Sequence, residues 1–310
     1  MRSPVRKQRR EAAEMVRTDR ETTANRLLKA SANLSYDPHV DIDWNAPLVD
    51  GSFFIPERTV SLYGTPLWDR MSHEQRVELS RQELINSVSV GIWFEIILMQ
   101  MLLRMSYNTD PTTAHVRYAL TEIADECRHS TMFSMLIEKV GGRPYRNPRP
   151  LQLTAQALPL ILRGPSMWVA TLIGEEVFDA LQREHLKDET VQPLVRAVMR
   201  IHVTEEARHV RYAREDLMRL LEHSPWPVRE FTRDVVAVGA LMLARILARP
   251  KQYARAGLPD PKRAAELAWA NPQRRETLAS GASRLVRFLA EADLIGGPSK
   301  KLWRDSGLLA

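Results

Sequence analysis

Apolar residues recur at helical spacing along most of the chain, and short alternating runs of the kind typical of strands are few. The pattern predicts four long helices, over residues 73–107, 112–140, 166–187 and 190–222. Ser72 is a good N-cap for the first, with Gln75 completing a capping box, and Gly141-Gly142 ends the second. Two antiparallel pairs of long helices are typical of a four-helix bundle.

Segments on either side of these helices predict additional structure. Prolines and glycines over 34–70 indicate an irregular segment that wraps a core. Further helices are expected at 11–33, within 143–165, at 228–248, near 261–269 and over 272–293, before a loose tail. We expect an all-α protein with three parts: an N-terminal arm and wrapping segment (1–70), the bundle core (71–250), and C-terminal helices packed on the same domain (251–310).

Composition is that of a globular protein, with 44% apolar and 26% charged residues in 310. The single cysteine, Cys127, excludes a disulfide within the chain and a cysteine-based zinc site, and we expect it to be a small packed residue. The start of the chain lacks the apolar segment of a secretory signal. Apolar runs such as 235–244 are shorter than a membrane span. A cytoplasmic protein without a membrane partner is therefore expected.

Much of the net charge of +6 lies in a basic N-terminal arm. Its cations are Arg2, Arg6, Lys7, Arg9 and Arg10. A basic arm can meet nucleic acid or an acidic surface. No nucleic-acid-binding motif accompanies it, so we interpret it as a solvated tail and expect no nucleic-acid partner.

An internal repeat carries the chemistry. Glu126-Cys-Arg-His129 and Glu206-Ala-Arg-His209 are two copies of Glu-x-x-His, 80 residues apart. Residues at i and i+3 share a helix face, so each copy directs a carboxylate and an imidazole the same way. One such copy is common and usually indicates surface ion pairs, whereas two at matched positions are hard to obtain by chance.

The repeat extends upstream to two more glutamates. Glu95 and Glu175 each lie 31 residues before the glutamate of a Glu-x-x-His copy. Glu95 sits in the apolar run 92–99, where a solvated glutamate is out of place. Glu176 is a rival for Glu175, but a helical wheel places Glu176 on the solvent side, with Asp179, Arg183 and Lys187. The 31-residue spacing and the helical wheel both favour Glu175 as the candidate ligand, but the choice between Glu175 and Glu176 stays open.

This is the ligand set of a ferritin-like, carboxylate-bridged dinuclear site, with one Glu from each of two helices and a Glu-x-x-His from each of the other two. Four carboxylates would neutralise two divalent ions, and without metal four buried glutamates would be very costly. His202, one turn before Glu206, is an additional candidate ligand, and its counterpart in the first half is Glu122. A satisfied core histidine is the alternative for His202.

For the polar residues next to the candidate ligands, and for the remaining histidines, the sequence supports simpler expectations. Asp125 and Glu205 precede the motif glutamates and either support the ligand histidines or face solvent. Arg128 and Arg208 match across the repeat and should form ion pairs with carboxylates. Four histidines without a partner pattern are interpreted as surface residues: His73, His115, His185 and His223.

Oxygen-rich ligation with two or three imidazoles favours iron or manganese over zinc or copper. Iron adds redox chemistry with O2. The sequence thus predicts a metal site before any resemblance is considered. A purely structural helical protein, with incidental Glu and His, is the alternative.

Several runs resemble the p-aminobenzoate N-oxygenase family of ferritin-like diiron arylamine oxygenases. They are Glu175-Glu-Val-Phe-Asp-Ala-Leu-Gln-Arg-Glu, Asp188-Glu-Thr-Val-Gln-Pro-Leu-Val-Arg, His202-Val-Thr-Glu-Glu-Ala-Arg-His-Val, and Glu126-x-x-His129 within Ala-Asp-Glu-Cys-Arg-His-Ser. The resemblance covers roughly residues 75–220, and the additional histidine is its specific feature.

The resemblance implies a diiron centre that activates O2 to N-oxygenate an arylamine or similar amine, taking electrons from an external donor. The implied ligands are Glu95, Glu126, His129, Glu175, His202, Glu206 and His209. No catalytic residue beyond them and no organic cofactor is expected, and a homodimer is possible. Weak candidates for the substrate cavity are Trp93, Phe94, Met99 and Trp168. Alternatives are another ferritin-like diiron oxidase or hydroxylase acting on a non-amine substrate, and a non-catalytic metal-binding bundle.

Overall fold

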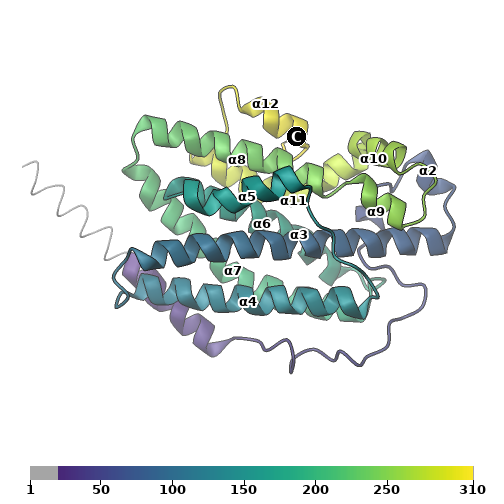
Figure 1. The fold of residues 1–310 in the computed structure, drawn as a ribbon, viewed down its shortest axis with the longest axis horizontal. Coiled ribbons are helices and arrows are strands. Elements are labelled where there is room, and N and C mark those ends of the chain that lie inside the picture. The colour runs from purple at the N-terminus through teal and green to yellow at the C-terminus, as the bar shows by residue number, and fades with distance from the viewer. Residues whose placement is uncertain (1–19, 310) are drawn as a thin grey trace, which may run out of the picture.

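Four long helices form the centre of the molecule in the computed structural model, which describes residues 20–309 (Figure 1). They are α3 (His73–Tyr107), α4 (Ala114–Lys139), α6 (Pro165–Lys187) and α7 (Pro193–Glu222). The part of the chain described has no sheet, and an isolated bridge joins Phe53 to Val191. The predicted all-α, four-helix-bundle architecture is confirmed.

Shorter helices surround the four. They are η1 (Glu57–Thr59), α2 (Pro66–Asp69), α5 (Arg149–Ile161), α8 (Trp226–Ile246), α9 (Pro250–Arg255), α10 (Pro261–Ala270), α11 (Pro272–Glu291) and α12 (Lys300–Ser306). Residues 20–33 are also helical, and the irregular segment after them runs along the outside of the bundle in Figure 1. The basic arm at residues 2–10 lies outside the described residues, so its expected role stays a prediction.

The helix starts follow from local chemistry. Ser72 and Gln75 form the predicted capping box at the start of α3, with the Ser72 amide donating to Gln75 Oε1 at 2.9 Å. The second helix begins at Ala114, two residues after the predicted start, because Thr113 supplies its N-cap. Asp110 instead accepts the Thr112 amide in the preceding turn.

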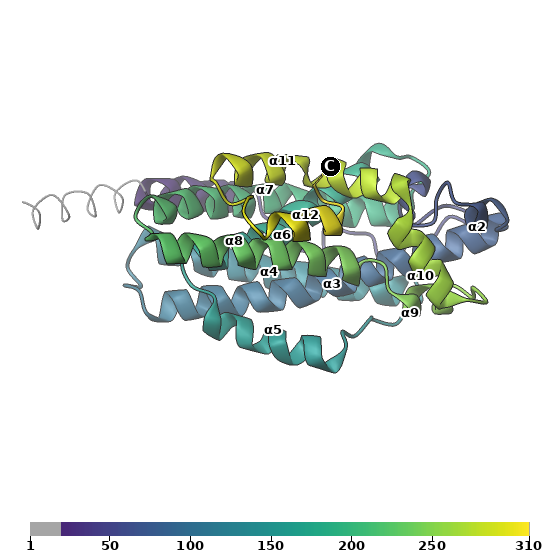
Figure 2. The same cartoon turned by 90° about the horizontal axis from the view of Figure 1, so that it is seen from above.

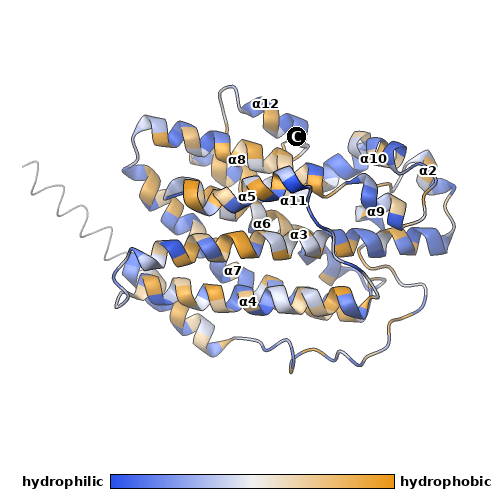
Figure 3. Cartoon of the chain, viewed as in Figure 1, coloured by the Kyte–Doolittle hydropathy of each residue, from blue (hydrophilic) through white to orange (hydrophobic). Residues whose placement is uncertain are grey.

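The helices are layered so that α6 lies at the centre. It packs against α7, α8 and α11, while α3 packs against α4, α5 and α6 (Figure 2). Most of these helices carry apolar residues on one side and polar residues on the other (Figure 3). α6 is buried over most of its length, so any charged side chain on it must find a partner or a metal.

Two expectations about hydrophobic segments are corrected. The expected loose tail contains α12, whose Trp303 is fully buried and anchors it in the main core. α3 is long and apolar enough, by length and composition, to cross a membrane, contrary to the expectation from the apolar runs. Core helices meet the same criterion, and α3 packs against α4, α5 and α6 here and holds a buried glutamate, Glu95.

Candidate metal centre

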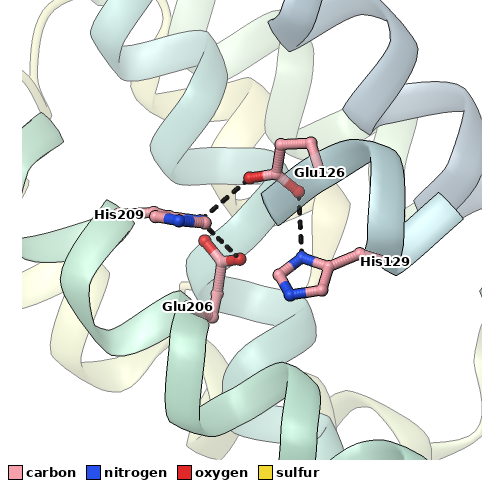
Figure 4. A group of neighbouring side chains, drawn as sticks. All are labelled: Glu126, His129, Glu206 and His209. Atoms are coloured by element: carbon pink, nitrogen blue, oxygen red, sulfur yellow. Dashed lines mark hydrogen bonds and ion pairs between the residues drawn. The ribbon is translucent and has the colours of Figure 1, made fainter. Parts of the chain in front are cut away.

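The two Glu-x-x-His motifs meet in the middle of the bundle. Glu126 and His129 come from α4 and face Glu206 and His209 from α7, and all four are at most 1% exposed (Figure 4). His129 Nδ1 lies 3.1 Å from Glu126 Oε2, and His209 Nδ1 lies 2.9 Å from Glu126 Oε1 and 3.3 Å from Glu206 Oε2. One donor atom from each residue lies within 4.8 Å of the others.

The remaining three predicted ligands extend this cluster. One donor atom of Glu95 lies within 4.8 Å of donor atoms of His129 and His202. One donor atom of Glu175 likewise lies within 4.8 Å of donor atoms of His202 and Glu206. His202 Nε2 lies 3.6 Å from Glu95 Oε1 and 3.9 Å from Glu206 Oε2. The structure therefore brings all seven residues together from α3, α4, α6 and α7. Their role as ligands stays a prediction.

Several donor atoms of the cluster lack a hydrogen-bond partner in the described part of the chain. They are Glu95 Oε1, Glu206 Oε1 and both ring nitrogens of His202. A buried polar atom without a partner costs about 1–3 kcal/mol. Unpartnered oxygen and nitrogen atoms that converge on one point in a dry core fit a pair of divalent metal ions, which such atoms would ligate.

The carboxylates of the metal-free cluster do not share their negative charge evenly. Burial, together with the charge of Glu126, raises the pKa of Glu95 to about 8. Burial also raises the pKa of Glu175 well above its usual value, with Glu206 acting in the same direction. Burial opposes ionisation of Glu126 as well, but His209 and His129 hold its pKa below the usual range. Metal ions would favour the ionised form of every one of them.

The histidines show the matching pattern. Against the cost of burial, hydrogen bonds to Glu126 and Glu205 raise the pKa of His129 to about 10. The charges of Glu206 and Glu126 raise the pKa of His209 well above its usual value, although burial opposes this. Burial and the charge of His129 instead lower the pKa of His202 to about 4. Protons on His129 and His209 thus balance the carboxylates when no metal is bound, and metal binding must release them.

A second pair of carboxylates orients the histidines. His129 Nε2 lies 2.9 Å from Glu205 Oε2, and His209 Nε2 lies 3.1 Å from Asp125 Oδ2. Each motif on one helix is therefore supported by an acid from the other helix, which leaves Nδ1 of each ring facing the cluster. Both acids are at most 1% exposed, so of the two expectations the supporting role is the one observed and the solvent-facing role is excluded.

Two arginines form ion pairs with the carboxylates that support the histidines, as expected. Arg128 forms an ion pair with Asp125, and Arg208 lies 3.6 Å from both Asp125 and Glu205. Ser130 Oγ donates to Glu95 Oε2 at 2.5 Å, a contact that sequence reasoning missed because the repeat contains no counterpart for it. These contacts hold the donors in place before any metal arrives.

Glu122 occupies the position on α4 that His202 occupies on α7. It is fully buried, neither oxygen has a hydrogen-bond partner among the described residues, and burial raises its pKa to about 8. The 80-residue offset pointed to this residue, but only its burial shows that it lies beside the cluster. It is thus a further buried glutamate beside the centre, in addition to the four proposed glutamate ligands and Glu205.

The structure separates Glu175 from its rival. Glu176 forms an ion pair with Arg214 and belongs to no group of neighbouring donor atoms among the described residues. It is nevertheless 6% exposed, so the expected solvent position is wrong: residues of α7 and α11 lie around it. Asp179, on the same side, pairs with Arg183 at 2.7 Å.

Three further expectations are wrong. His115 and His185 are buried, at 2% and 8% exposure, whereas His73 and His223 are exposed as expected. Cys127 is exposed rather than packed, and its sulfur lies 3.4 Å from Met99 Sδ. The helix periodicity places a residue on a face, but which faces are covered depends on long-range packing.

Two cavities in the described part of the chain do not involve the residues suggested for substrate binding. A groove of about 760 Å³ runs between α6, α7 and α11, and a cavity of about 90 Å³ lies near Glu83 and His185. Trp93, Phe94, Met99 and Trp168 line neither. Phe94 packs edge-to-face on Phe178, so its part in binding substrate stays a prediction.

Fold and cluster together define a helical-bundle protein whose core holds a buried cluster of carboxylates and imidazoles that could bind metal. The family model described as P-aminobenzoate N-oxygenase AurF matches residues 17–293. The chain therefore belongs to the AurF family.

The chain is also similar to individual proteins and to solved structures. Uncharacterized proteins of Mycobacterium bovis and Mycobacterium tuberculosis are 31% identical over 204 residues, 63% of this chain. The match spans 59% of the length of those relatives. Two variants of an R2-like ligand-binding oxidase, solved with an anaerobically reconstituted Mn/Fe cofactor, each give a TM-score of 0.48. They are 16% and 14% identical to this chain and cover 82% and 88% of it, and 91% and 93% of their own chains.

Proposed function

We propose that this protein is a non-haem diiron oxygenase that uses O2 and electrons from an external donor to N-oxygenate an arylamine or similar small amine. One observation carries the proposal: seven buried carboxylate and imidazole side chains converge between α3, α4, α6 and α7 in a member of an N-oxygenase family. A cytoplasmic location, a separate electron donor and a homodimer remain predictions.

Each residue of the cluster has a definite task in this proposal. Glu126 and Glu206 would hold both ions together with the motif histidines, since one donor atom from each of these four residues lies within 4.8 Å of the others. Glu95, Glu175 and His202 would complete the two coordination shells. Bound iron would supply the reduction of O2 that side chains cannot perform.

The surrounding protein would control the reaction in two ways. Asp125 and Glu205 contact the Nε2 atoms of His209 and His129 and so fix the ring orientation, which would leave Nδ1 of each ring to meet a bound iron. Burial of the whole cluster keeps bulk water from the oxidant, which favours transfer of oxygen to an amine over wasteful side reactions.

The experiment is to load the purified protein with Fe(II), supply a reductant and O2, and incubate it with a panel of aminoarenes. We expect mass spectrometry to detect hydroxylamine, nitroso or nitro products that carry oxygen from isotopically labelled O2. A Glu206→Ala variant, which lacks one of the proposed ligands, should form none.

Other outcomes decide between the alternatives. C-hydroxylated or desaturated products, with O2 uptake but no N-oxygenation, would establish a different oxidase on the same scaffold. Iron uptake without any substrate-dependent consumption of O2 and reductant would indicate a metal-binding bundle without catalysis. Either result contradicts the amine N-oxygenase proposal.

A further inference from the structure

Helix α5 is held to the rest of the molecule along one side. Its buried residues Ala155 and Pro159 face inward, and the Arg104 guanidinium of α3 donates to the Pro159 carbonyl at 2.6 Å. α5 makes its main contacts with α3, and Figure 2 shows it at the edge of the molecule, outside α3. The opposite side of α5 therefore faces away from the bundle.

The outward side of α5 carries large apolar residues. Leu153 and Leu160 are seven residues apart, which is two helical turns, so they lie on one face. They are 64% and 65% exposed, and the neighbouring Ile161 is 57% exposed. The outer face of a solvated surface helix is ordinarily polar. Three such side chains on one helix form an apolar surface of the kind that marks contact with another molecule or with a membrane.

The segment that contains α5 is also strongly basic. No acidic residue occurs between Glu138 and Glu175, although 38 acidic residues in a chain of 310 would place about four in a stretch of this length. The same stretch has five cations, which are Lys139, Arg143, Arg146, Arg149 and Arg163. The four arginines are exposed, and none forms an ion pair with a described residue. Their charge is therefore directed to the surroundings.

Local helix chemistry gives no reason for these cations. The first turn of α5 has no acidic residue, and Pro148 supplies no side-chain cap. Arg149 is the first residue of the helix, at the end where the helix dipole favours an anion. Arg255 of α9 donates to the Arg143 carbonyl at 2.6 Å and brings a further cation to this end. Anions supplied from outside would complement both the arginines and the dipole.

The combination of aliphatic and basic residues discriminates among partners. A second copy that met this face through a two-fold axis would place the arginines against the same arginines. Nucleic acid would neutralise the arginines but leave the leucines in water. A membrane surface with anionic lipids offers both contacts, because its headgroups attract the cations and its acyl chains accept the leucines.

We propose that α5 lies in the surface of a membrane that contains anionic lipids. Its exposed leucines would enter the boundary between headgroups and acyl chains, and Arg146, Arg149 and Arg163 would lie among the phosphates. The expectation of no membrane partner rested on the absence of a spanning run, and a peripheral contact needs none. The contact does not depend on the metal centre, so this proposal and the proposed function can fail separately.

Flotation with lipid vesicles tests the contact on the purified full-length protein. Vesicles of phosphatidylcholine alone are compared with vesicles that also contain phosphatidylglycerol. A variant with Leu153→Gln and Leu160→Gln changes only side chains that are mostly exposed, so it should fold. A variant with Val40→Gln and Val238→Gln is the control, because these side chains are 78% and 48% exposed on other segments.

We expect the wild type and the control to bind the anionic vesicles and not phosphatidylcholine alone. The leucine variant should bind at least about tenfold more weakly, because its apolar surface is lost. A variant with Arg146→Gln and Arg149→Gln should also bind about tenfold more weakly or less, since each cation near an anionic surface contributes roughly a factor of five. Changing the five cations of the N-terminal arm to glutamine should leave the effect of the leucine variant intact.

Hydrogen–deuterium exchange locates the contact. Amides of residues 149–161 should exchange more slowly on anionic vesicles, while those of α11 should not change. No binding of the wild type to anionic vesicles, equal binding by the leucine variant and the control, or unaltered exchange in α5 overturns the proposal. A wild-type dimer that the leucine variant converts to a monomer, without vesicle binding, overturns it too and makes this face an interface between copies.

Discussion

Glu83 shows how one buried carboxyl outside the metal cluster makes stability depend on pH. It lies on α3 twelve residues before Glu95, which is about 18 Å along a helix. Its oxygens accept the amide of Ser61 at 3.0 Å and the hydroxyl of Ser61 at 2.5 Å. Burial raises its pKa to about 7, against 4.5 for an unperturbed glutamate.

Because the folded state holds this proton more tightly than the unfolded chain, the stabilising contribution is complete below pH 4.5 and is lost as pH rises towards 7. Glu83→Gln cannot ionise, so we expect it to exceed the wild type in unfolding free energy by about 2–3 kcal/mol at pH 8 and to match it near pH 4. Urea unfolding of the metal-free proteins measures the difference.

The exposed Glu291 provides the control for this effect. Glu291→Gln should leave the pH dependence of the wild type unchanged. If Glu83→Gln showed the same pH dependence as the wild type, Glu83 would not titrate in the range inferred from its burial.

Individual residues differ in how far the sequence could predict them. Six of the seven cluster residues were predictable because the internal repeat fixes their spacing, and His202 because it lies one turn before Glu206 on the same helix face. The cross-pairing of Asp125 with His209, and of Glu205 with His129, was not, because it depends on how α4 and α7 approach each other. Burial of His115 and Glu122 likewise depends on neighbours that are distant in sequence.

At the scale of elements, the contact between α3 and α6 sets the distance between Glu95 and Glu175. Gly174 allows the close approach: a Cβ atom there would lie 3.1 Å from Phe94 Cδ1. That separation is too short for comfortable packing, so a larger residue must displace the ring or the helix. Glu175 is the next residue and would move with α6.

We expect Gly174→Ala to weaken metal binding, measured by competition with a chromogenic chelator. Overpacking costs about 1–3 kcal/mol, which exceeds the roughly 1 kcal/mol that alanine gains over glycine in a helix. Adding Phe94→Leu should restore affinity by making room. Gly296→Ala, where a Cβ meets nothing within 4 Å, is the control. Wild-type affinity in Gly174→Ala would mean that helix spacing does not position Glu175.

Helix boundaries were predictable where local chemistry determines them. Ser72 and Gln75 gave the start of α3 because a capping box is contained within four residues. The start of α4 was predicted two residues too early, because Thr113 supplies its N-cap while Asp110 closes the preceding turn. α12 was missed because its stability comes from burial of Trp303 rather than from local propensity.

At the scale of the whole molecule, the fold class followed from four long amphipathic patterns, whereas the covering layers did not. Residues of α7 and α11 lie around Glu176 on α6 and turn it from an expected surface residue into a buried ion pair with Arg214. Such long-range coverage has no local sequence signal. The bundle can therefore be predicted from periodicity, but the walls around its centre cannot.

The central claim is that the seven-residue cluster holds two metal ions, and metal analysis tests it most directly. Protein purified from iron-supplemented cells should contain about two iron ions per chain, the stoichiometry of this ligand arrangement. Glu126→Ala and Glu206→Ala should lose most of that iron, because each removes a carboxylate proposed as a ligand, while Glu176→Ala should keep it. Near-stoichiometric zinc, or no metal in a folded wild-type protein, would contradict the account.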